Sequence, residues 1–373
     1  MVEVPRSPAL QKAPTAAVQV VTASCDAVPA DAPHALGVNY WFQAASHGAP
    51  YTVRLRVVGR RRDAGFGDPA SSFDVVRTVT DVVPGSGPVA VTLRVVDVAP
   101  GQWDVWVVPE EDDRPGAPAQ DLAAGSASGA SGFSPLVRVQ GPGVRVAAWP
   151  TLVVLAAALG VTVQSALAGA VGLPRGRLLA VALLACLIGL AGAKTYYLLT
   201  HPASGRAGGG RDGMSVQGFI IASITTLVLG AAAWSMPVGS VLGVTAPALL
   251  AGLAVGRLGC FFGGCCAGRP TASRWGVWSS DRRIGVRRVP TQLLEATSAA
   301  VLVVPAALIV SANPATGLQV FVGFLAAYIL GRQLLFPWRS IPRATRHGRT
   351  LTMVASGAAL VAAAGSLLAG VPW

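Results

Sequence analysis

Acidic residues are almost missing from the second part of this chain. From residue 147 to residue 373 there are three acids against 17 basic residues, whereas residues 1–146 hold 14 acids and 12 bases. The second part therefore supplies the whole of the +12 net charge. Its arginines interrupt apolar runs instead of forming a soluble basic face, and no nucleic-acid module is recognisable. This bias argues against nucleic acid and favours anionic lipid head groups or anionic substrates.

Cysteine is also scarce, with five residues in 373 and no C-x2-C pair. Cys25 lacks the spaced partner of an antibody-type domain. Cys186 lies inside an apolar run, where a thiol behaves as a small hydrophobe. A disulfide framework is therefore not expected.

The other three cysteines stand close together as Cys260, Cys265 and Cys266. Their C-x4-C-C spacing differs from the paired spacing that zinc sites favour, and no histidine lies in the segment. A metal site and a thiolate nucleophile activated by the nearby Arg257 are the two alternatives. We expect small packing residues in a tight turn instead, and neither a metal nor a cofactor.

What the second part does contain is seven apolar runs, each long enough to cross a bilayer. Abundant Ala and Gly inside the runs would let the helices pack closely. The sequence therefore predicts an α-helical membrane protein with a seven-helix bundle in residues 147–373. The expected spans are 147–171, 178–199, 214–235, 238–257, 291–311, 315–336 and 350–370.

The first part of the chain, residues 1–146, has the sequence pattern of β-strands. Runs such as 51–58, 89–98 and 102–108 alternate or are β-branched, and Pro, Gly and Asp bound them. Short strands at this spacing predict an antiparallel, immunoglobulin-like β-sandwich as an extramembrane domain over residues 16–142. Residues 1–15 are expected to form a flexible tail, and the Ala/Gly/Ser-rich residues 115–132 a loop.

Counting membrane crossings places the unusual polar residues on one face. They come from the end of the second span, the start of the third, the end of the fourth, the start of the fifth and the end of the sixth. Individually each has an ordinary explanation, such as snorkelling or a stabilising ion pair. Together they predict a cationic site suited to a lipid phosphate. The candidates are His201, Ser215, Gln217, Gly218, Arg257, Gly259, Cys260, Cys265, Gly268, Gln292, Glu295, Arg332 and Arg339.

The longest motif is the glycine- and cysteine-rich turn of residues 256–268, which reads GRLGCFFGGCCAG. Residues 213–219 read GMSVQGF, and residues 289–295 read VPTQLLE. In this order they resemble the prolipoprotein diacylglyceryl transferase family, whose motifs have the forms G-R-I-G-N-F-x-N-x-E-x-x-G, G-M-S-F-H-G-G and H-P-S-Q-L-Y-E. A divergent branch with G-C-F-x-x-G-C-C-x-G is closer. The resemblance covers residues 147–370 and includes the seven helices.

The resemblance implies transfer of a diacylglyceryl group from phosphatidylglycerol to the lipobox cysteine of a lipoprotein precursor, in the bacterial plasma membrane. Arg257 and Arg332 match the family's phosphate-side arginines. Gln217 replaces the motif histidine, and an amide is not a base at ordinary pH. Either His201 or a cysteine substitutes for that histidine, or the chemistry is altered or lost.

Further departures from the family pattern fall on positions other than the two phosphate-side arginines. Cys260 and Cys265 replace the signature asparagine and glutamate, and Phe336 replaces a glutamate of the sixth span. The sequence is therefore consistent with two functions. One is an active membrane transferase. The other is a catalytically altered member that acts as a lipid-binding scaffold, whose sandwich domain recruits a protein partner.

The charge of the loops and the resemblance disagree on membrane orientation. The face with the candidate site carries most of the loop arginines, which places it in the cytoplasm by charge bias. The resemblance places it outside, where precursor proteins emerge. Because site arginines are selected for their ligand, we expect the outer face.

Overall fold

The computed structural model describes residues 17–21, 32–63, 71–110, 122–200, 214–340, 346–371 and 373. The expected tail, Cys25 and His201 lie outside these ranges. The chain divides into two compact units, and the described residues of 1–149, 260–292 and 338–341 form the first. The second unit comprises the described residues of 150–259, 293–337 and 342–373. Each unit is considered by itself.

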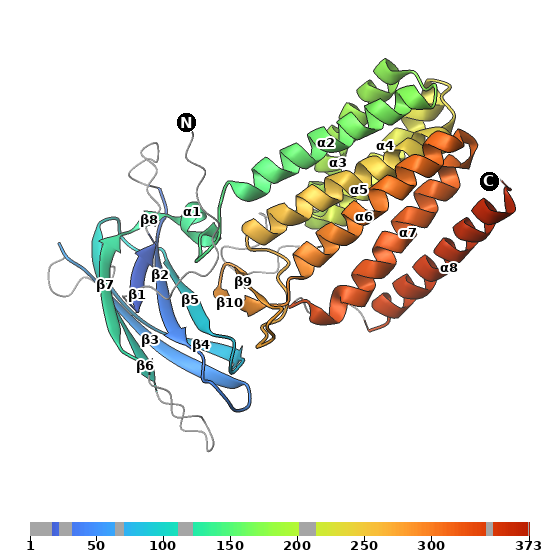
Figure 1. Cartoon of the computed structure of the whole chain (residues 1–373). Coiled ribbons are helices and arrows are strands. Elements are labelled where there is room, and N and C mark those ends of the chain that lie inside the picture. Colours follow the sequence, from blue (N-terminus) through green and yellow to red (C-terminus); the bar gives the residue numbers. More distant parts are fainter. Residues whose placement is uncertain are drawn as a thin grey trace, which may run out of the picture. The chain divides into compact units, whose positions relative to one another are not determined.

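The first unit contains two antiparallel sheets that share one hydrophobic core (Figure 1). One sheet has the order β1-β2-β5-β10-β9, with β8 pairing β2, and the other has the order β4-β3-β6-β7. The antiparallel β-region expected before the helices is therefore confirmed. The strands are β1 (Val18–Val21), β2 (His34–Gln43), β3 (Tyr51–Arg61), β4 (Ser72–Val82), β5 (Pro88–Val96), β6 (Gln102–Glu110), β7 (Gly125–Ala130), β8 (Gly132–Phe133), β9 (Val277–Ser280) and β10 (Ile284–Arg288).

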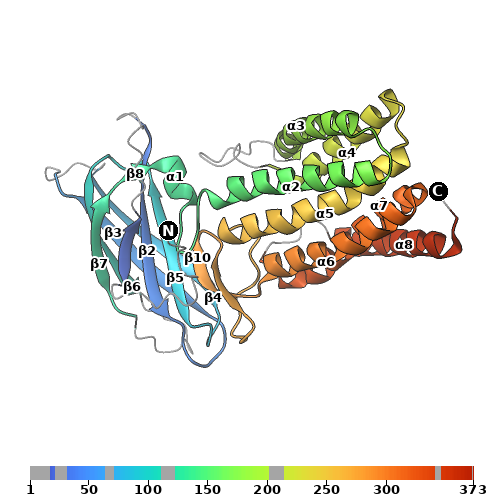
Figure 2. The same ribbon diagram turned by 45° about the horizontal axis from the view of Figure 1, so that its top comes forward.

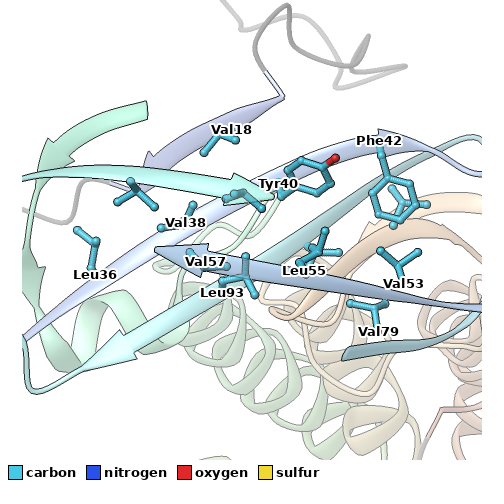
Figure 3. Packing of buried hydrophobic residues seen from close by; sticks show 14 of the residues in the cluster. Val18, Leu36, Val38, Tyr40, Phe42, Val53, Leu55, Val57, Val79 and Leu93 are labelled. Atoms are coloured by element: carbon cyan, nitrogen blue, oxygen red, sulfur yellow. The ribbon is translucent and has the colours of Figure 1, made fainter. Parts of the chain in front are cut away.

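The core lies between the two sheets and follows from the alternation of β3. Val53, Leu55 and Val57 of β3 are buried, and Arg54 and Arg56 between them are exposed. This period of two gives one face to the core and the other to solvent. Figure 3 shows the buried β3 residues beside residues of β2 and β5. Burial of such side chains contributes about 1.5–3 kcal/mol each.

The last two strands come from the connection between the fourth and fifth spans. The hairpin β9–β10 joins the first sheet because β10 pairs with β5, with Gly285 opposite Ala90. The Trp278 ring stacks on Trp41 at 5.7 Å between centroids, and its Nε1 donates to the Pro88 carbonyl at 3.0 Å. The sequence analysis recognised only the glycine- and cysteine-rich turn in this connection and missed the hairpin. Its strands are only four and five residues long, and their partner lies nearly 200 residues earlier in the chain.

Seven helices long and apolar enough to cross a membrane occur among the described residues, as predicted (Figures 1 and 2). The largest boundary difference is at α5, which continues to Phe262 instead of ending at residue 257. Residues 125–130, expected within a loop, form β7. The spans are α2 (Ala148–Ala170), α3 (Arg175–Thr200), α4 (Val216–Ala233), α5 (Val238–Phe262), α6 (Thr291–Ala312), α7 (Gly317–Leu335, flanked by short 3-10 turns) and α8 (Gly348–Ala369). A short helix, α1 (Ser134–Val139), precedes them.

Within the second unit α5 is the most buried span, so it forms the centre of the bundle. Small residues allow the neighbouring helices to approach closely. A Cβ at Gly218 of α4 would lie 2.4 Å from the carbonyl oxygen of Gly192 in α3. This contact requires glycine, and it fixes where α4 crosses α3.

Candidate functional site

An ion pair buried in the second unit is the main feature of the site. The Nε atom of Arg257 in α5 lies 2.8 Å from a carboxylate oxygen of Glu295 in α6. Their side chains are 6% and 1% exposed. The Arg257 Nε also donates to the Tyr328 hydroxyl of α7 at 3.4 Å. Three helices therefore contribute one polar group each to the interior of the bundle.

Burying two charges is costly, and the mutual attraction compensates only where the geometry is good. Glu295 supplies the counter-charge of the Arg257 guanidinium in the interior of the bundle, away from water. The Glu295 carboxylate is therefore placed to hold the orientation of the Arg257 guanidinium. The pair gives the bundle a fixed cationic group, which is suited to an anionic ligand.

Arg332 lies four residues after Tyr328 on α7, so the two occupy the same helix face. Arg332 is partly buried, and Tyr328 of that face contacts Arg257. Arg257 therefore lies on the face of α5 that contacts α7, and Arg332 lies on the α7 face that carries Tyr328. Gly259, the third candidate in this region, is buried near the end of α5.

The segment at the start of α4 has a structural role. Ser215 caps the helix, because its Oγ accepts from the Gly218 backbone N–H at 3.5 Å. Gly218 packs against the α3 backbone, as described above. Gln217 is exposed, so its amide does not reach into the bundle. Position 217 therefore supplies no interior polar group.

Another group of candidates lies in the first unit. Gly268 pairs with Arg339 in an isolated β-bridge, and its carbonyl accepts from Arg288 at 2.9 Å. Arg288 in turn forms a 2.8 Å ion pair with Asp281, and burial lowers the pKa of Arg288. Gln292 donates to the Cys265 carbonyl at 3.0 Å. These contacts order the loops around the cysteine-bearing turn.

The three cysteines of this turn are gathered closely. The sulfur atoms of Cys260, Cys265 and Cys266 all lie within 4.8 Å of one another. Hydrogen bonds with the other two thiols, and then burial, raise the pKa of the Cys265 thiol well above its usual range. A thiolate nucleophile at Cys265 is therefore disfavoured in this state.

The structure thus separates the predicted residues into two groups. Arg257, Glu295 and Arg332 lie on α5, α6 and α7 of the second unit. Cys265, Gly268, Gln292 and Arg339 belong to the first unit, together with Cys260. Sequence reasoning missed Tyr328, although a tyrosine one turn before Arg332 in an apolar span was an available signal.

A seven-helix membrane bundle with a buried arginine–carboxylate pair, joined to a β-sheet unit, defines a multi-pass membrane protein with a polar intramembrane site. A model of the prolipoprotein diacylglyceryl transferase family matches residues 136–369, which is more than half of the chain. The chain belongs to the prolipoprotein diacylglyceryl transferase family. No curated protein matches it. Membership implies a transferase of the prolipoprotein diacylglyceryl type in lipoprotein biosynthesis.

Proposed function

We propose that this chain transfers a diacylglyceryl group from phosphatidylglycerol to the cysteine thiol of a lipoprotein precursor, at the outer face of the bacterial plasma membrane. The observation that carries the proposal is the Arg257–Glu295 pair at 2.8 Å. An interior cation held in place by a carboxylate is what an anionic phospholipid head group requires in a medium without water.

In the proposed reaction the acceptor sulfur forms a bond to the glyceryl carbon that carries the phosphoester oxygen. That carbon–oxygen bond breaks, and glycerol phosphate leaves with the electron pair. Negative charge therefore grows on the leaving phosphate in the transition state. Arg257 and Arg332 stabilise this charge, and Glu295 holds the Arg257 guanidinium in its orientation.

The acceptor thiol must also lose its proton to a base. Gln217 cannot take this role because an amide does not accept a proton at neutral pH, and its side chain is exposed. His201 is the proposed base, and a cysteine of the 260–266 turn is the alternative. On this proposal His201→Ala abolishes transfer, and transfer that survives the change redirects the search to the cysteines.

Lipid binding tests the role of the arginines separately from transfer. Arg257→Ala and Arg332→Ala should each weaken phosphatidylglycerol binding by about 2 kcal/mol, the loss expected for a buried charge-assisted contact. Arg177→Ala is the matched control because Arg177 is exposed at the start of α3. Purified protein in nanodiscs, titrated with labelled phosphatidylglycerol and with zwitterionic phosphatidylethanolamine, provides the measurement. Unchanged binding by both variants would place the lipid site elsewhere.

The exposure of Gln217, with cysteines at two signature positions, favours a second candidate function. In this alternative the chain binds anionic lipid without transferring it, and its proposed immunoglobulin-like sandwich recruits a protein partner. Phosphatidylglycerol binding that depends on Arg257, with no thioether product from any lipobox peptide, would support this function over the first.

A further inference from the structure

The thiol cluster of the first unit has the composition and the dimensions of a metal site. Cys260 lies in the last turn of α5, and Cys265 and Cys266 follow it by five and six residues. Each offers one sulfur, and all three sulfurs lie within 4.8 Å. Thiolates bound to one zinc ion at about 2.3 Å would be roughly 3.8 Å apart. Small side-chain rotations would bring the sulfurs from the present separations of up to 4.8 Å to the roughly 3.8 Å of a zinc site.

The backbone holds the three cysteines in this arrangement. The Cys265 N–H donates to the Cys260 carbonyl at 3.0 Å, which closes the turn after α5. The Gln292 amide, on the first turn of α6, fixes the Cys265 carbonyl at 3.0 Å. Cys266 has a left-handed φ of 55°, which is uncommon for a residue other than glycine. The thiols are therefore oriented by backbone contacts before any ligand arrives.

We propose that Cys260, Cys265 and Cys266 together bind one thiophilic metal ion, with Zn²⁺ or Cu⁺ as the ions that suit three thiolates. Soft thiolate ligands select these ions over Mg²⁺ or Ca²⁺. No histidine or carboxylate joins the cluster among the described residues. The site is therefore three-coordinate for Cu⁺, or has a fourth position for water or an added thiol in the case of Zn²⁺.

The charges around the cluster fit a metal–thiolate centre. Three thiolates carry more negative charge than either ion neutralises, so a net anion remains. Cys265 borders a cavity of about 430 Å³ whose other walls include Arg94, Arg138, Arg282 and Arg283. Asp281 also borders this cavity, and it is already paired with Arg288 at 2.8 Å. Among the described residues that line this cavity, four are arginines and one is an acid, so the lining beside Cys265 is mainly cationic.

Arg282 and Arg283 place their positive charges close to Arg94. Burial, followed by the charges of Arg283 and Arg282, lowers the pKa of Arg94. The Arg94 guanidinium is held in place by the carbonyls of Val137, Gln140 and Arg282. An anionic metal–thiolate centre at Cys265 would relieve this repulsion.

Metal titration of the full chain tests the proposal independently of transferase activity. The protein is purified in detergent, reduced, stripped with a chelator and titrated with Co²⁺, a spectroscopic probe for zinc sites. We expect one Co²⁺ per chain with a thiolate charge-transfer band, and displacement by Zn²⁺. A parallel titration with Cu⁺ against a competing chelator distinguishes the two ions. An added small thiol should change the Co²⁺ spectrum if the fourth position is open.

Serine variants locate the site. Mutating a group that only hydrogen-bonds a metal ligand typically costs about 10–100-fold in metal affinity. Replacing a ligand itself, as in Cys260→Ser, Cys265→Ser and Cys266→Ser, should therefore weaken binding by at least about tenfold. Cys186→Ser, which changes a cysteine of α3 outside the cluster, should bind like the parent. If the fully reduced protein binds neither Co²⁺ nor Cu⁺, the proposal is overturned. A disulfide within the cluster, found by mass spectrometry in a chain that takes up no metal once reduced, would make it a redox pair instead.

Discussion

Arg257 of α5 and Glu295 of α6 form an ion pair at 2.8 Å in the interior of the helix bundle, with side chains 6% and 1% exposed. The acid is the only one in the predicted spans, and it meets one of the few arginines that lie within an apolar run. This contact joins two helices, and the two residues are 38 positions apart in the sequence. It gives the proposed cationic site a fixed geometry in this chain.

Removing one partner of the pair should be costly. Arg257→Met and Glu295→Leu should each lower the free energy of unfolding by about 3–5 kcal/mol, because the remaining charge is left buried without its partner. The double variant should be close to the parent, since an apolar pair of similar volume removes both charges together. Denaturant unfolding of the detergent-solubilised protein gives the three values. Additive losses in the double variant would show that the two residues do not act as a pair.

The turn around Gly268 should not tolerate a side chain. A Cβ at this position would lie 2.0 Å from the Val289 carbonyl oxygen, a backbone atom that cannot move away freely. Gly268→Ala should therefore lower the melting temperature and reduce the yield of folded protein. Gly331→Ala is the control, since a Cβ there meets nothing within 4 Å and alanine favours a helix by about 0.5–1 kcal/mol. Equal melting temperatures for the two variants would contradict this account of the turn.

The bundle was predictable because a bilayer-spanning helix leaves a long apolar run that needs no knowledge of its neighbours. The strand β3 was predictable for a similar reason, since the alternation of Val53, Leu55 and Val57 with arginines is local. The hairpin β9–β10 was not predictable, because its short strands are specified by pairing with β5 far away in the sequence. Strand β7 was missed since glycine, serine and alanine carry no strand signal.

Gln217 should contribute little to catalysis. Its side chain is exposed at the start of α4, whereas Ser215 and Gly218 on either side build the helix cap and the contact with α3. We expect Gln217→Ala to change the transfer rate by less than about twofold, below the 10²–10⁴-fold typical of a general acid or base. Initial rates with saturating donor lipid provide the measurement. A loss of 100-fold or more would place the amide at the reacting atoms.

Tyr40 should make the β-sheet unit sensitive to high pH. Burial raises the pKa of Tyr40 to about 12, and its hydroxyl donates to the Ala123 carbonyl at 2.9 Å. Because the folded pKa exceeds the value of about 10 in the unfolded chain, the stabilisation is complete below pH 10 and declines as pH rises toward 12. A difference titration of phenolate absorbance between the parent and Tyr40→Phe should show one group with a midpoint near 12. A midpoint near 10 would mean that Tyr40 is accessible to solvent.

The candidate site was only partly predictable. The sequence could place Arg257 and Glu295 at the ends of spans on one face, because the order of crossings fixes that much. It could not show that Gln217 is exposed, since the rotation of α4 is set by the packing of Gly218 on α3. Nor could it show that the three thiols meet, because their distances depend on the left-handed backbone at Cys266 and the contact from Gln292.

The most direct test is to look for the product. Purified protein in nanodiscs is incubated with phosphatidylglycerol and a lipobox peptide, and the peptide is examined by mass spectrometry for a thioether-linked diacylglyceryl group. The account predicts this product from the parent and from Arg177→Ala. It predicts a loss of at least about 100-fold for Arg257→Lys, because an ammonium does not reproduce the guanidinium fork. Transfer at the parental rate by Arg257→Lys would contradict the assignment of the Arg257–Glu295 pair as the centre of the site.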